Sequence, residues 1–389
     1  MNIYIELRQH VGALCIPIVS VGDTILRGQL IATPTGLGAN IHASVTGTVL
    51  EMTDTQIIVK MADDQPNDFE KIPEGLSLLE AIEQAGIVGA GGAGFPTHVK
   101  YENKIEGGTL IANAVECEPV LGHNVKLMEE QPDVIIRGLK YLLEISRAKN
   151  AYIAMKLKYR KAALALGKAC KYEPNIKVKF VSDMYPAGDE RVIIRELLGV
   201  ELQPGELPSV AKAIVSNVET IKHIVNAIEL RKPYIDKDLT VSGRIQSGTK
   251  IFVNQPIGIP VSYYIKQCGG YIEPYGEIVI GGPFTGQSGT ENTPLTKTTG
   301  GILVAMPFPQ EHRKIGLLAC ECGADEERLR AIAEAMGAEV IISEKCKRMV
   351  ECNGRYRCDL PGICPGQTEK ILKMKKAGVE AVIAGSCEP

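Results

Sequence analysis

The sequence predicts a mixed α/β protein built from several domains. The chain has 389 residues, which is enough for two to four domains. Hydrophobic residues make up 45% and charged residues 23%, as in ordinary globular proteins. The first part of the chain shows only strand-like segments, and the second part alternates strands with helical patterns. A third part again shows only short strands, and a fourth part alternates strands with helices. This succession predicts four domains, at residues 1–62, 76–232, 235–306 and 314–389.

The first domain is expected to be all-β. Its short alternating apolar segments are separated by turn residues such as Gly22-Asp23 and Gly36. The run VGDTILRGQLIA…IHASVTGTVLEM resembles the barrel-sandwich hybrid of biotinyl and lipoyl domains. Those carriers present a lysine at a hairpin tip, and the matching span 34–44 contains none. We therefore expect a structural barrel without a carrier lysine, followed by a polar linker.

The second domain alternates helix and strand, starting with a helix at Ser77. The predicted strands are residues 109–115, 150–156 and 178–183. Helical patterns lie between these strands, at residues 125–129, 132–146 and 159–171. This order is typical of a doubly wound sheet, on which ligands bind at the carboxyl ends of the strands.

The last two domains repeat the contrast. Residues 235–306 contain short strands with Gly and Pro turns, which predicts a small β-rich domain. Residues 314–389 read strand, helix, strand, helix, strand, and the helix near residues 324–338 has acidic residues in its first turn and Gly337 near its end.

Composition excludes several classes of protein. The net charge is −3 without a basic block, which argues against nucleic acid as a partner. No apolar run approaches the roughly 18 to 20 residues of a transmembrane helix. The start MNIYIELRQH has no basic region followed by an apolar core, so we expect no signal peptide and a cytoplasmic protein.

The most informative segment is the glycine loop, residues 86–100, with the sequence GIVGAGGAGFPTHVK. It holds five glycines within nine residues. Backbone without Cβ atoms can approach a ligand closely, and successive N–H groups in such a loop bind phosphate. Lys100 adds a positive charge at the end of the segment. A tight structural loop is the alternative interpretation.

Three further polar segments lie near predicted strand ends: residues 113–119 (NAVECEP), 185–191 (YPAGDER) and 216–220 (SNVET). Taken singly, Asp189 and Glu190 could simply complement a helix N-terminus, and Asn217 could cap a helix. Together with the glycine loop they supply a phosphate cradle, amides, hydroxyls and acids. That inventory suits FMN and a dinucleotide.

The order GGAGFPTHVK, NAVECEP, YPAGDE, NVET resembles the flavin- and NADH-binding subunit of respiratory complex I. It resembles more closely the RnfC family, the C subunits of Rnf electron-transport complexes, over residues 5–306. Within that family the chain is most similar to the electron-transfer proteins associated with proline reductase in amino-acid-fermenting anaerobes. The resemblance implies a complex I flavoprotein-like α/β domain, a β-grasp (SLBB-like) domain at 235–306, and FMN and NADH as cofactors.

The resemblance also implies roles for individual residues. Those implied to hold the cofactors are Gly89, Gly91, Gly92, Gly94, Lys100, Asn113, Glu116, Gly188, Asn217 and Thr220. Those implied to stack on or line the reacting nicotinamide side, or to contact the dinucleotide, are Phe95, Glu118, Asp189 and Glu190. The complex I relative has an acid where this chain has Val115, which changes the expected hydrogen bonding to the isoalloxazine. His98 and His123 are expected to be solvent-facing or core residues.

Seven of the eleven cysteines lie in the last 70 residues, at Cys320, Cys322, Cys346, Cys352, Cys358, Cys364 and Cys387. The family resembled carries two runs C-x2-C-x2-C-x3-C-P for iron–sulfur clusters, and this chain has neither. If the last strands are parallel, Cys320, Cys322, Cys346 and Cys387 emerge at one sheet edge. One [4Fe–4S] cluster, a dithiol relay, and inert or zinc-bound cysteines remain open alternatives.

The sequence ends at Cys387-Glu388-Pro389, where a strand should pass into a helix. A C-x-x-C motif suits such a place, because a helix N-terminus lowers a thiol pKa. We therefore expect the chain to be truncated and to continue with cysteine or selenocysteine, giving a dithiol or selenothiol pair. The next codons of the gene test this expectation.

The expected function is oxidation of NADH by an FMN electron-transfer protein that serves a partner reductase, most directly proline reductase. Electrons are expected to leave through some subset of Cys320, Cys322, Cys346 and Cys387. One alternative is a peripheral NADH-binding subunit of a membrane ion-pumping complex of the Rnf type. Another is a non-catalytic scaffold that has lost its flavin.

Overall fold

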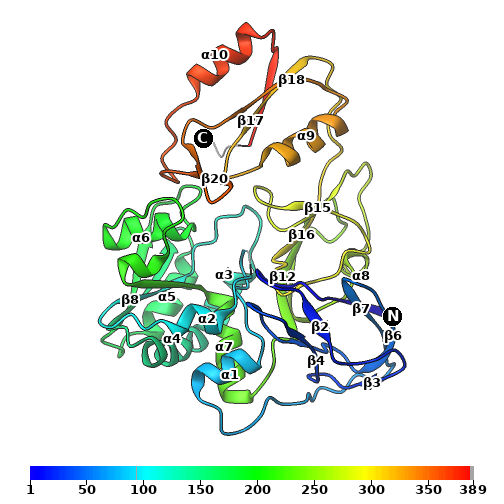
Figure 1. The fold of residues 1–389 in the computed structure, drawn as a ribbon, viewed down its shortest axis with the longest axis vertical. Coiled ribbons are helices and arrows are strands. Elements are labelled where there is room, and N and C mark those ends of the chain that lie inside the picture. The colour runs from blue at the N-terminus through cyan, green and yellow to red at the C-terminus, as the bar shows by residue number, and fades with distance from the viewer. Residues whose placement is uncertain (93, 386–389) are drawn as a thin grey trace.

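The computed structural model describes residues 1–92 and 94–385, and within them the strands form six sheets (Figure 1). The sheets follow one another along the chain as the sequence pattern predicts, strand-only regions alternating with α/β regions. In the described part of the chain, no helix is both long and apolar enough to span a membrane.

The N-terminal region is all-β, as predicted, and consists of two small antiparallel sheets. Alternate residues such as Ile3, Ile5, Ile57 and Val59 are buried, which is the period of a half-buried strand. The first sheet has the order β1 (Asn2–Glu6), β7 (Gln56–Met61), β6 (Gly47–Met52), β3 (Thr24–Ile25). The second has the order β2 (Cys15–Pro17), β4 (Leu30–Pro34), β5 (Ile41–His42).

A four-stranded parallel sheet forms the centre of the second region, which we call the flavin unit. Its strand order is β10 (Ile176–Val181), β9 (Asn150–Lys156), β8 (Thr109–Asn113), β11 (Ala213–Asn217). The parallel arrangement confirms the predicted doubly wound pattern, and β11 is a strand beyond the three predicted. Strand β8 ends two residues earlier than predicted, because the Asn113 side chain accepts a hydrogen bond from Val115 N and turns the chain.

Helices cover both faces of this sheet. The helices are α1 (Leu78–Gln84), α2 (Thr97–Glu102), α3 (His123–Glu130), α4 (Pro132–Ser146), α5 (Arg160–Ala169), α6 (Glu190–Leu198) and α7 (Val218–Leu230), with a 3-10 turn at Pro208–Ala211. Ser77 begins α1 with a complete capping box to Glu80, as the sequence predicts. Leu110 and Ile111 point into different cores, one beneath α4 and α7 and the other beneath α6.

The third region is a five-stranded mixed sheet covered by one helix. Its order is β13 (Lys250–Pro256), β12 (Asp236–Gly243), β16 (Gly301–Val304), β14 (Ile278–Ile280), β15 (Gln287–Gly289), and the helix is α8 (Val261–Gln267). Tyr264 and Ile265 of α8 join a core that also contains Ile3 and Ile57 of the N-terminal sheets. The first and third regions therefore share one hydrophobic core.

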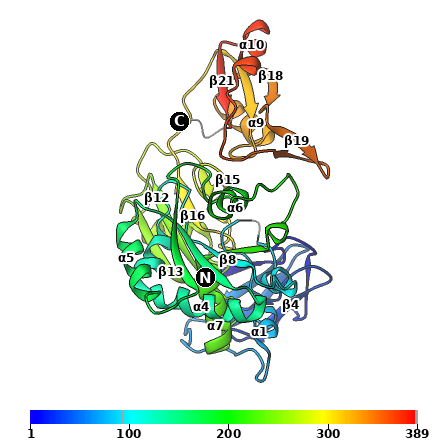
Figure 2. The ribbon, with the colours of Figure 1, turned by 90° about the vertical axis from the view of Figure 1, so that its left-hand side faces the viewer.

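The last region, which we call the C-terminal unit, contains the predicted strands and helices, and its three main strands are parallel. The order is β18 (Glu339–Lys345), β17 (Lys314–Ala319), β21 (Ala381–Ala384), with helices α9 (Glu326–Ala335) and α10 (Thr368–Lys376). An additional hairpin, β19 (Met349–Cys352) and β20 (Arg355–Cys358), is not part of the prediction. Figures 1 and 2 place this unit at one end of the molecule, next to α6, and polar contacts such as Arg195 Nη2 to Pro361 O, 2.9 Å, join the two.

Candidate functional site

The polar segments predicted from the sequence meet where the parallel strands β8 and β11 end. Asn113 and Asn217 are the last residues of these two strands and lie opposite each other in the register. The glycine loop lies beside them, because Ala90 N donates to Thr220 Oγ1 at 2.9 Å. Four segments far apart in sequence thus form one site at the edge where such sheets bind ligands.

Backbone contacts join the two ends of the glycine loop, whereas the backbone near its tip has free space beside it. Gly89 N donates to Phe95 O at 3.0 Å, and Val88 and Pro96 form a bridge. A Cβ added at Gly91 would lie 3.0 Å from the Asn217 amide nitrogen, so the backbone approaches that side chain closely. A Cβ at Gly92, whose φ is +123°, would meet no atom of the described chain within 4 Å. Gly94 has a φ of +68°.

Lys100 reaches away from the loop tip toward the sheet. Its Nζ donates to Glu190 Oε1 at 2.7 Å and to the Val215 carbonyl at 2.6 Å. The ion pair thus joins Lys100, which the resemblance assigns to holding the cofactors, to Glu190, which it assigns to the dinucleotide side. Phe95 is 38% exposed, so part of its surface is accessible to a ligand.

Asn113 fixes the segment between β10 and α6. Its Nδ2 donates to the Gly188 carbonyl at 2.9 Å. Gly188 N in turn donates to Cys117 Sγ at 2.8 Å, and burial raises the pKa of that thiol to about 11. The strand end and the YPAGDE segment are thereby locked together.

Glu116 and Asn124 form a buried polar pair. Burial raises the pKa of Glu116 to about 7, even though Asn124 Nδ2 donates to its carboxylate at 3.2 Å. Among the described residues, the buried Asn124 Oδ1 finds no hydrogen-bond donor. Buried acceptors usually have a hydrogen-bond donor, and a ligand or a water molecule can supply one here.

Two acids of the predicted site accept hydrogen bonds from other protein groups. Glu118 accepts hydrogen bonds from Phe284 N at 2.9 Å, Thr285 N at 3.1 Å and Thr285 Oγ1 at 2.5 Å, all from the third region. Asp189 caps α6, accepting from Arg191 N at 2.8 Å, and burial raises its pKa. These hydrogen bonds tie Glu118 to residues 284–285 of the third region.

Asn217 likewise caps α7, accepting from Glu219 N at 2.8 Å. Its Oδ1 is therefore occupied by the helix, while its Nδ2 faces Gly91. The capping role that the sequence allowed as an alternative is present in the structure, and it leaves the amide donor for the loop side.

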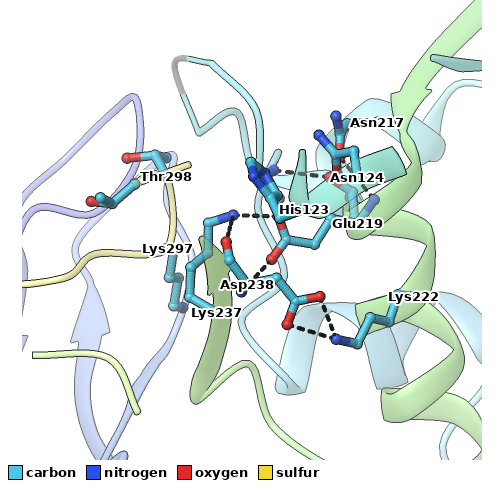
Figure 3. Close-up of polar contacts among 12 residues, drawn as sticks. His123, Asn124, Asn217, Glu219, Lys222, Lys237, Asp238, Lys297 and Thr298 are labelled. Atoms are coloured by element: carbon cyan, nitrogen blue, oxygen red, sulfur yellow. Dashed lines mark hydrogen bonds and ion pairs between the residues drawn. The ribbon is translucent and has the colours of Figure 1, made fainter. Parts of the chain in front are cut away.

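A buried charge network lies beneath the site and was not predicted (Figure 3). Lys237 Nζ donates to Glu219 Oε2, and Asp238 N donates to Glu219 Oε1 at 2.8 Å. Lys222 Nζ donates to both Asp238 oxygens at 2.9 and 2.7 Å. Burial alone would raise the pKa of Glu219, but the Lys237 ammonium outweighs it and holds the pKa below its usual range.

This network joins β12 to α7, whose first turn contains Glu219 of the NVET segment. His123 lies beside it, and burial lowers its pKa to about 4, so it is a neutral core histidine as expected. Glu219 belongs to the quoted NVET motif, yet its neighbours are known only from the fold, since Lys237 and Asp238 lie on another element.

The C-terminal cysteines separate into two groups. Cys320 and Cys346 directly follow neighbouring parallel strands, and Cys346 N donates to the Ala319 carbonyl at 2.8 Å. Cys358 N donates to the carboxylate of Glu321, the residue between Cys320 and Cys322. Cys352 lies elsewhere, with its sulfur 3.4 Å from the Pro204 carbonyl, and Cys364 is exposed near Gln367. The redox role predicted for Cys387 concerns a residue outside the described part of the chain.

Comparisons with known proteins match two parts of the chain to family models and much of the chain to named relatives. Residues 1–64 match the RnfC barrel sandwich hybrid domain, and residues 82–226 match the Nuo51 FMN-binding domain. The C subunit of the proton-translocating ferredoxin:NAD(+) oxidoreductase complex of Clostridium ljungdahlii is 34% identical over 325 residues, which are 78% of this chain and 70% of that protein. The C subunit of the Na(+)-translocating complex of Acetobacterium woodii is 31% identical, over 77% of this chain and 72% of its own length.

Cobalamin reductase PduS of Salmonella typhimurium is 37% identical over 63% of this chain, and the chain spans about half of that protein, 53%. Among solved structures, the H2-reduced NAD+-reducing [NiFe]-hydrogenase is similar with a TM-score of 0.50 and 22% identity, covering 59% of this chain and 46% of that one. The similarity to the hydrogenase concerns the fold alone.

Proposed function

We propose that this chain, which belongs to the RnfC family, oxidises NADH at an FMN held between the glycine loop and the ends of β8 and β11, and passes the electrons to a partner reductase. The observation that carries the proposal is the match of residues 82–226 to an FMN-binding domain, coinciding with the open loop tip beside Asn217.

The residues of the site fit FMN. Among the described residues, no atom obstructs a Cβ at Gly92 and none donates to the buried Asn124 Oδ1. A flat ligand against the loop would use the first and donate a hydrogen bond to the second. We assign binding of FMN to the residues that the sequence predicts, namely Gly89, Gly91, Gly92, Gly94, Lys100, Asn113, Glu116, Gly188, Asn217 and Thr220. FMN, when bound, accepts hydride from NADH and releases electrons singly or in pairs.

The protein's own contribution is orientation and proton handling. We assign the dinucleotide side to Phe95, Glu118, Asp189 and Glu190, with the Phe95 ring as the stacking surface. Glu116 has a pKa of about 7, so its carboxyl exchanges a proton near neutral pH beside the amide of Asn124.

The partner is the finer part of the proposal. We propose proline reductase, because the sequence resembles electron-transfer proteins of that system and lacks ferredoxin-type cysteine runs. We further assign residues 235–306 to a β-grasp (SLBB-like) domain and residues 314–389 to a cysteine-rich redox domain. The relatives named as subunits of ion-translocating complexes favour a second candidate, a peripheral subunit of such a complex.

The test is anaerobic purification, reconstitution with FMN and titration with NADH. We expect a yellow protein whose flavin absorbance is bleached by stoichiometric NADH and restored by an acceptor dye. A protein that stays colourless and leaves NADH unconsumed with every dye refutes the proposal. Co-purification with proline reductase subunits, as against membrane subunits, decides between the two partners.

A further inference from the structure

A buried lysine joins the N-terminal region to the start of the glycine loop. Lys297 lies in the connector at residues 290–300, between β15 and β16, and is 1% exposed. Its Nζ donates to the Asn40 carbonyl and to the Gly86 carbonyl, both at 2.7 Å. Asn40 directly precedes β5, and Gly86 is the first residue of the glycine loop. One amino group therefore links three parts of the chain that are far apart in sequence.

This approach explains why the loop begins with a glycine. Gly86 has a φ of +66°, which disfavours other residues. A Cβ added there would collide with the Asn40 carbonyl oxygen and would lie 3.0 Å from Lys297 Nζ. The first glycine of the loop is thus a place where the backbone packs against the rest of the protein.

The same two regions contact the loop again at Gly94. Val11 N donates to the Gly94 carbonyl at 3.3 Å. A Cβ added at Gly94 would lie 2.9 Å from Thr298 Cγ2 and 3.0 Å from the Gln9 carbonyl oxygen. Thr298 directly follows Lys297, and Figure 3 shows both residues on the connector. The connector and the N-terminal region therefore contact the glycine-rich stretch at residues 86 and 94.

Lys297 is itself held in place through its backbone. Its N donates to Gln9 Oε1 at 3.1 Å, and its carbonyl accepts from the Tyr234 hydroxyl at 2.7 Å. Tyr234 N donates in turn to the carbonyl of Ala85, the residue before Gly86, at 2.9 Å. The lysine is thus bonded at its nitrogen, its oxygen and its side chain, so its position relative to the loop is well defined.

The chemistry of the side chain favours a role in fixing the loop. Among the described residues, Lys297 Nζ bonds two carbonyls and no carboxylate. Burying an ammonium without a counter-charge is costly, and an apolar side chain would fill the same space at lower cost. Burial lowers the pKa of Lys297 to about 7, and the neutral amine still has an N–H for each carbonyl. The link therefore needs a long donor side chain rather than its charge.

The fixed start of the loop is close to the part assigned to FMN. Only residues 87–90 lie between Gly86 and Gly91. Ile87 is fully buried, and Ala90 N donates to Thr220 Oγ1 of α7 at 2.9 Å. A displacement of Gly86 therefore passes through a short, packed stretch to the backbone at Gly91.

We propose that Lys297 is a positioning residue of the FMN site, which fixes the start of the glycine loop against the N-terminal region so that the loop is ordered before FMN binds. This deepens, and rests on, the proposed function. A binding loop that is already ordered loses less conformational entropy on binding, so its affinity for the ligand is higher. The N-terminal region, which lacks a carrier lysine in residues 34–44, then serves as the support for the loop.

The first test measures FMN affinity in the full-length, flavin-free chain by fluorescence titration. Lys297→Met keeps the length of the side chain and removes its donors, and we expect it to weaken FMN binding at least tenfold. Gly86→Ala displaces the same contact while the lysine stays, so it should weaken binding as well. Ile265→Ala, in the core shared by the first and third regions, is the control for lost stability and should leave FMN affinity within twofold of wild type.

The second test measures amide hydrogen exchange without FMN. In Lys297→Met we expect the peptide at residues 82–92 to exchange at least tenfold faster, while peptides of α4 and β9 exchange as in wild type. Exchange reports local opening, so this result separates a released loop from a destabilised fold.

Three results refute the positioning role. The first is an FMN dissociation constant in Lys297→Met that equals that of wild type or of Ile265→Ala. The second is an unchanged exchange rate at residues 82–92. The third is faster exchange in α4 to the same degree as in the loop, because the lysine then supports the whole fold. If wild-type protein binds no FMN, the proposed function fails, while the exchange rates still decide whether Lys297 fixes the loop.

Discussion

Glu219→Gln is predicted to destabilise the flavin unit strongly, because it leaves a buried ammonium without its counter-charge. The Glu219 and Lys237 side chains are 2% and 0% exposed. Glutamine keeps the shape, and its oxygen still accepts from Asp238 N, but its NH2 group replaces the oxygen that accepts from the Lys237 ammonium. Breaking a buried ion pair by removing one partner costs about 3–5 kcal/mol. This is a large share of the roughly 5–15 kcal/mol that stabilises a typical protein.

The assay is urea unfolding at pH 7.5, followed by far-ultraviolet circular dichroism. Glu229→Gln is the matched control, since Glu229 lies on the same helix and pairs with the half-exposed Arg137. An exposed pair of this kind contributes about 0–1 kcal/mol. Adding Lys237→Met to Glu219→Gln should recover much of the loss, because both charges are then absent.

The pH dependence has a definite sign. Glu219 has a lowered pKa in the folded state, so its contribution is present above the unfolded pKa of about 4.3. That contribution is lost as the pH falls through the lower folded value. A loss below 1 kcal/mol at pH 7.5, or a double variant no more stable than Glu219→Gln, refutes the reasoning.

Three further predictions concern the loop, an acid and a buried lysine. Gly91→Ala should weaken FMN binding at least tenfold in a fluorescence titration, because its Cβ crowds the Asn217 amide, whereas Gly167→Ala, whose Cβ meets nothing in the described chain, should bind normally. Because the pKa of Glu116 is about 7, FMN affinity should change with pH with a midpoint near pH 7, and Glu116→Gln should abolish that change. A midpoint near pH 7 that persists in the variant contradicts this prediction. Burial lowers the pKa of Lys297 to about 7, so the unfolded chain binds more protons than the folded protein between pH 7 and about 10.4. Across that range the free energy of unfolding of the wild type should rise by about 4 kcal/mol relative to that of Lys297→Met. A difference between the two proteins that stays constant with pH contradicts the prediction.

The parts of the fold that the sequence predicts well have strong local patterns. The strand at 150–156 and the helix at 132–146 have the predicted bounds. The helix starts at Pro132 and ends before Arg147, which adopts a left-handed conformation. Buried apolar runs with clear ends leave little freedom in the assignment.

The hairpin that carries Cys358 could not be predicted in this way. Its strands, β19 and β20, have four residues each and are mostly exposed, so they show no apolar alternation. The strand pattern of the C-terminal unit placed Cys320 and Cys346 at one sheet edge, whereas the position of Cys358 depends on contacts with Glu321 and Arg191 from other elements.

The buried charges were hidden for a related reason. The sequence Asp236-Lys237-Asp238 is typical of an exposed turn, yet β12 buries all three residues. Each charge is compensated by a residue on another element, such as Lys222 for Asp238. A local pattern contains no information on such pairs, while the capping roles of Asp189 and Asn217 are local and were among the interpretations of the sequence.

The core shared by the first and third regions has a consequence for synthesis of the protein. Ile3 and Ile57 belong to the same hydrophobic core as Ile302 and Val304, so the N-terminal sheets cannot finish burying their apolar faces until about the last quarter of the chain is being translated. A nascent chain released near residue 226 would expose that surface and aggregate. Shortened versions of the protein should therefore keep residues 1–304 together and end within residues 305–313, between β16 and β17.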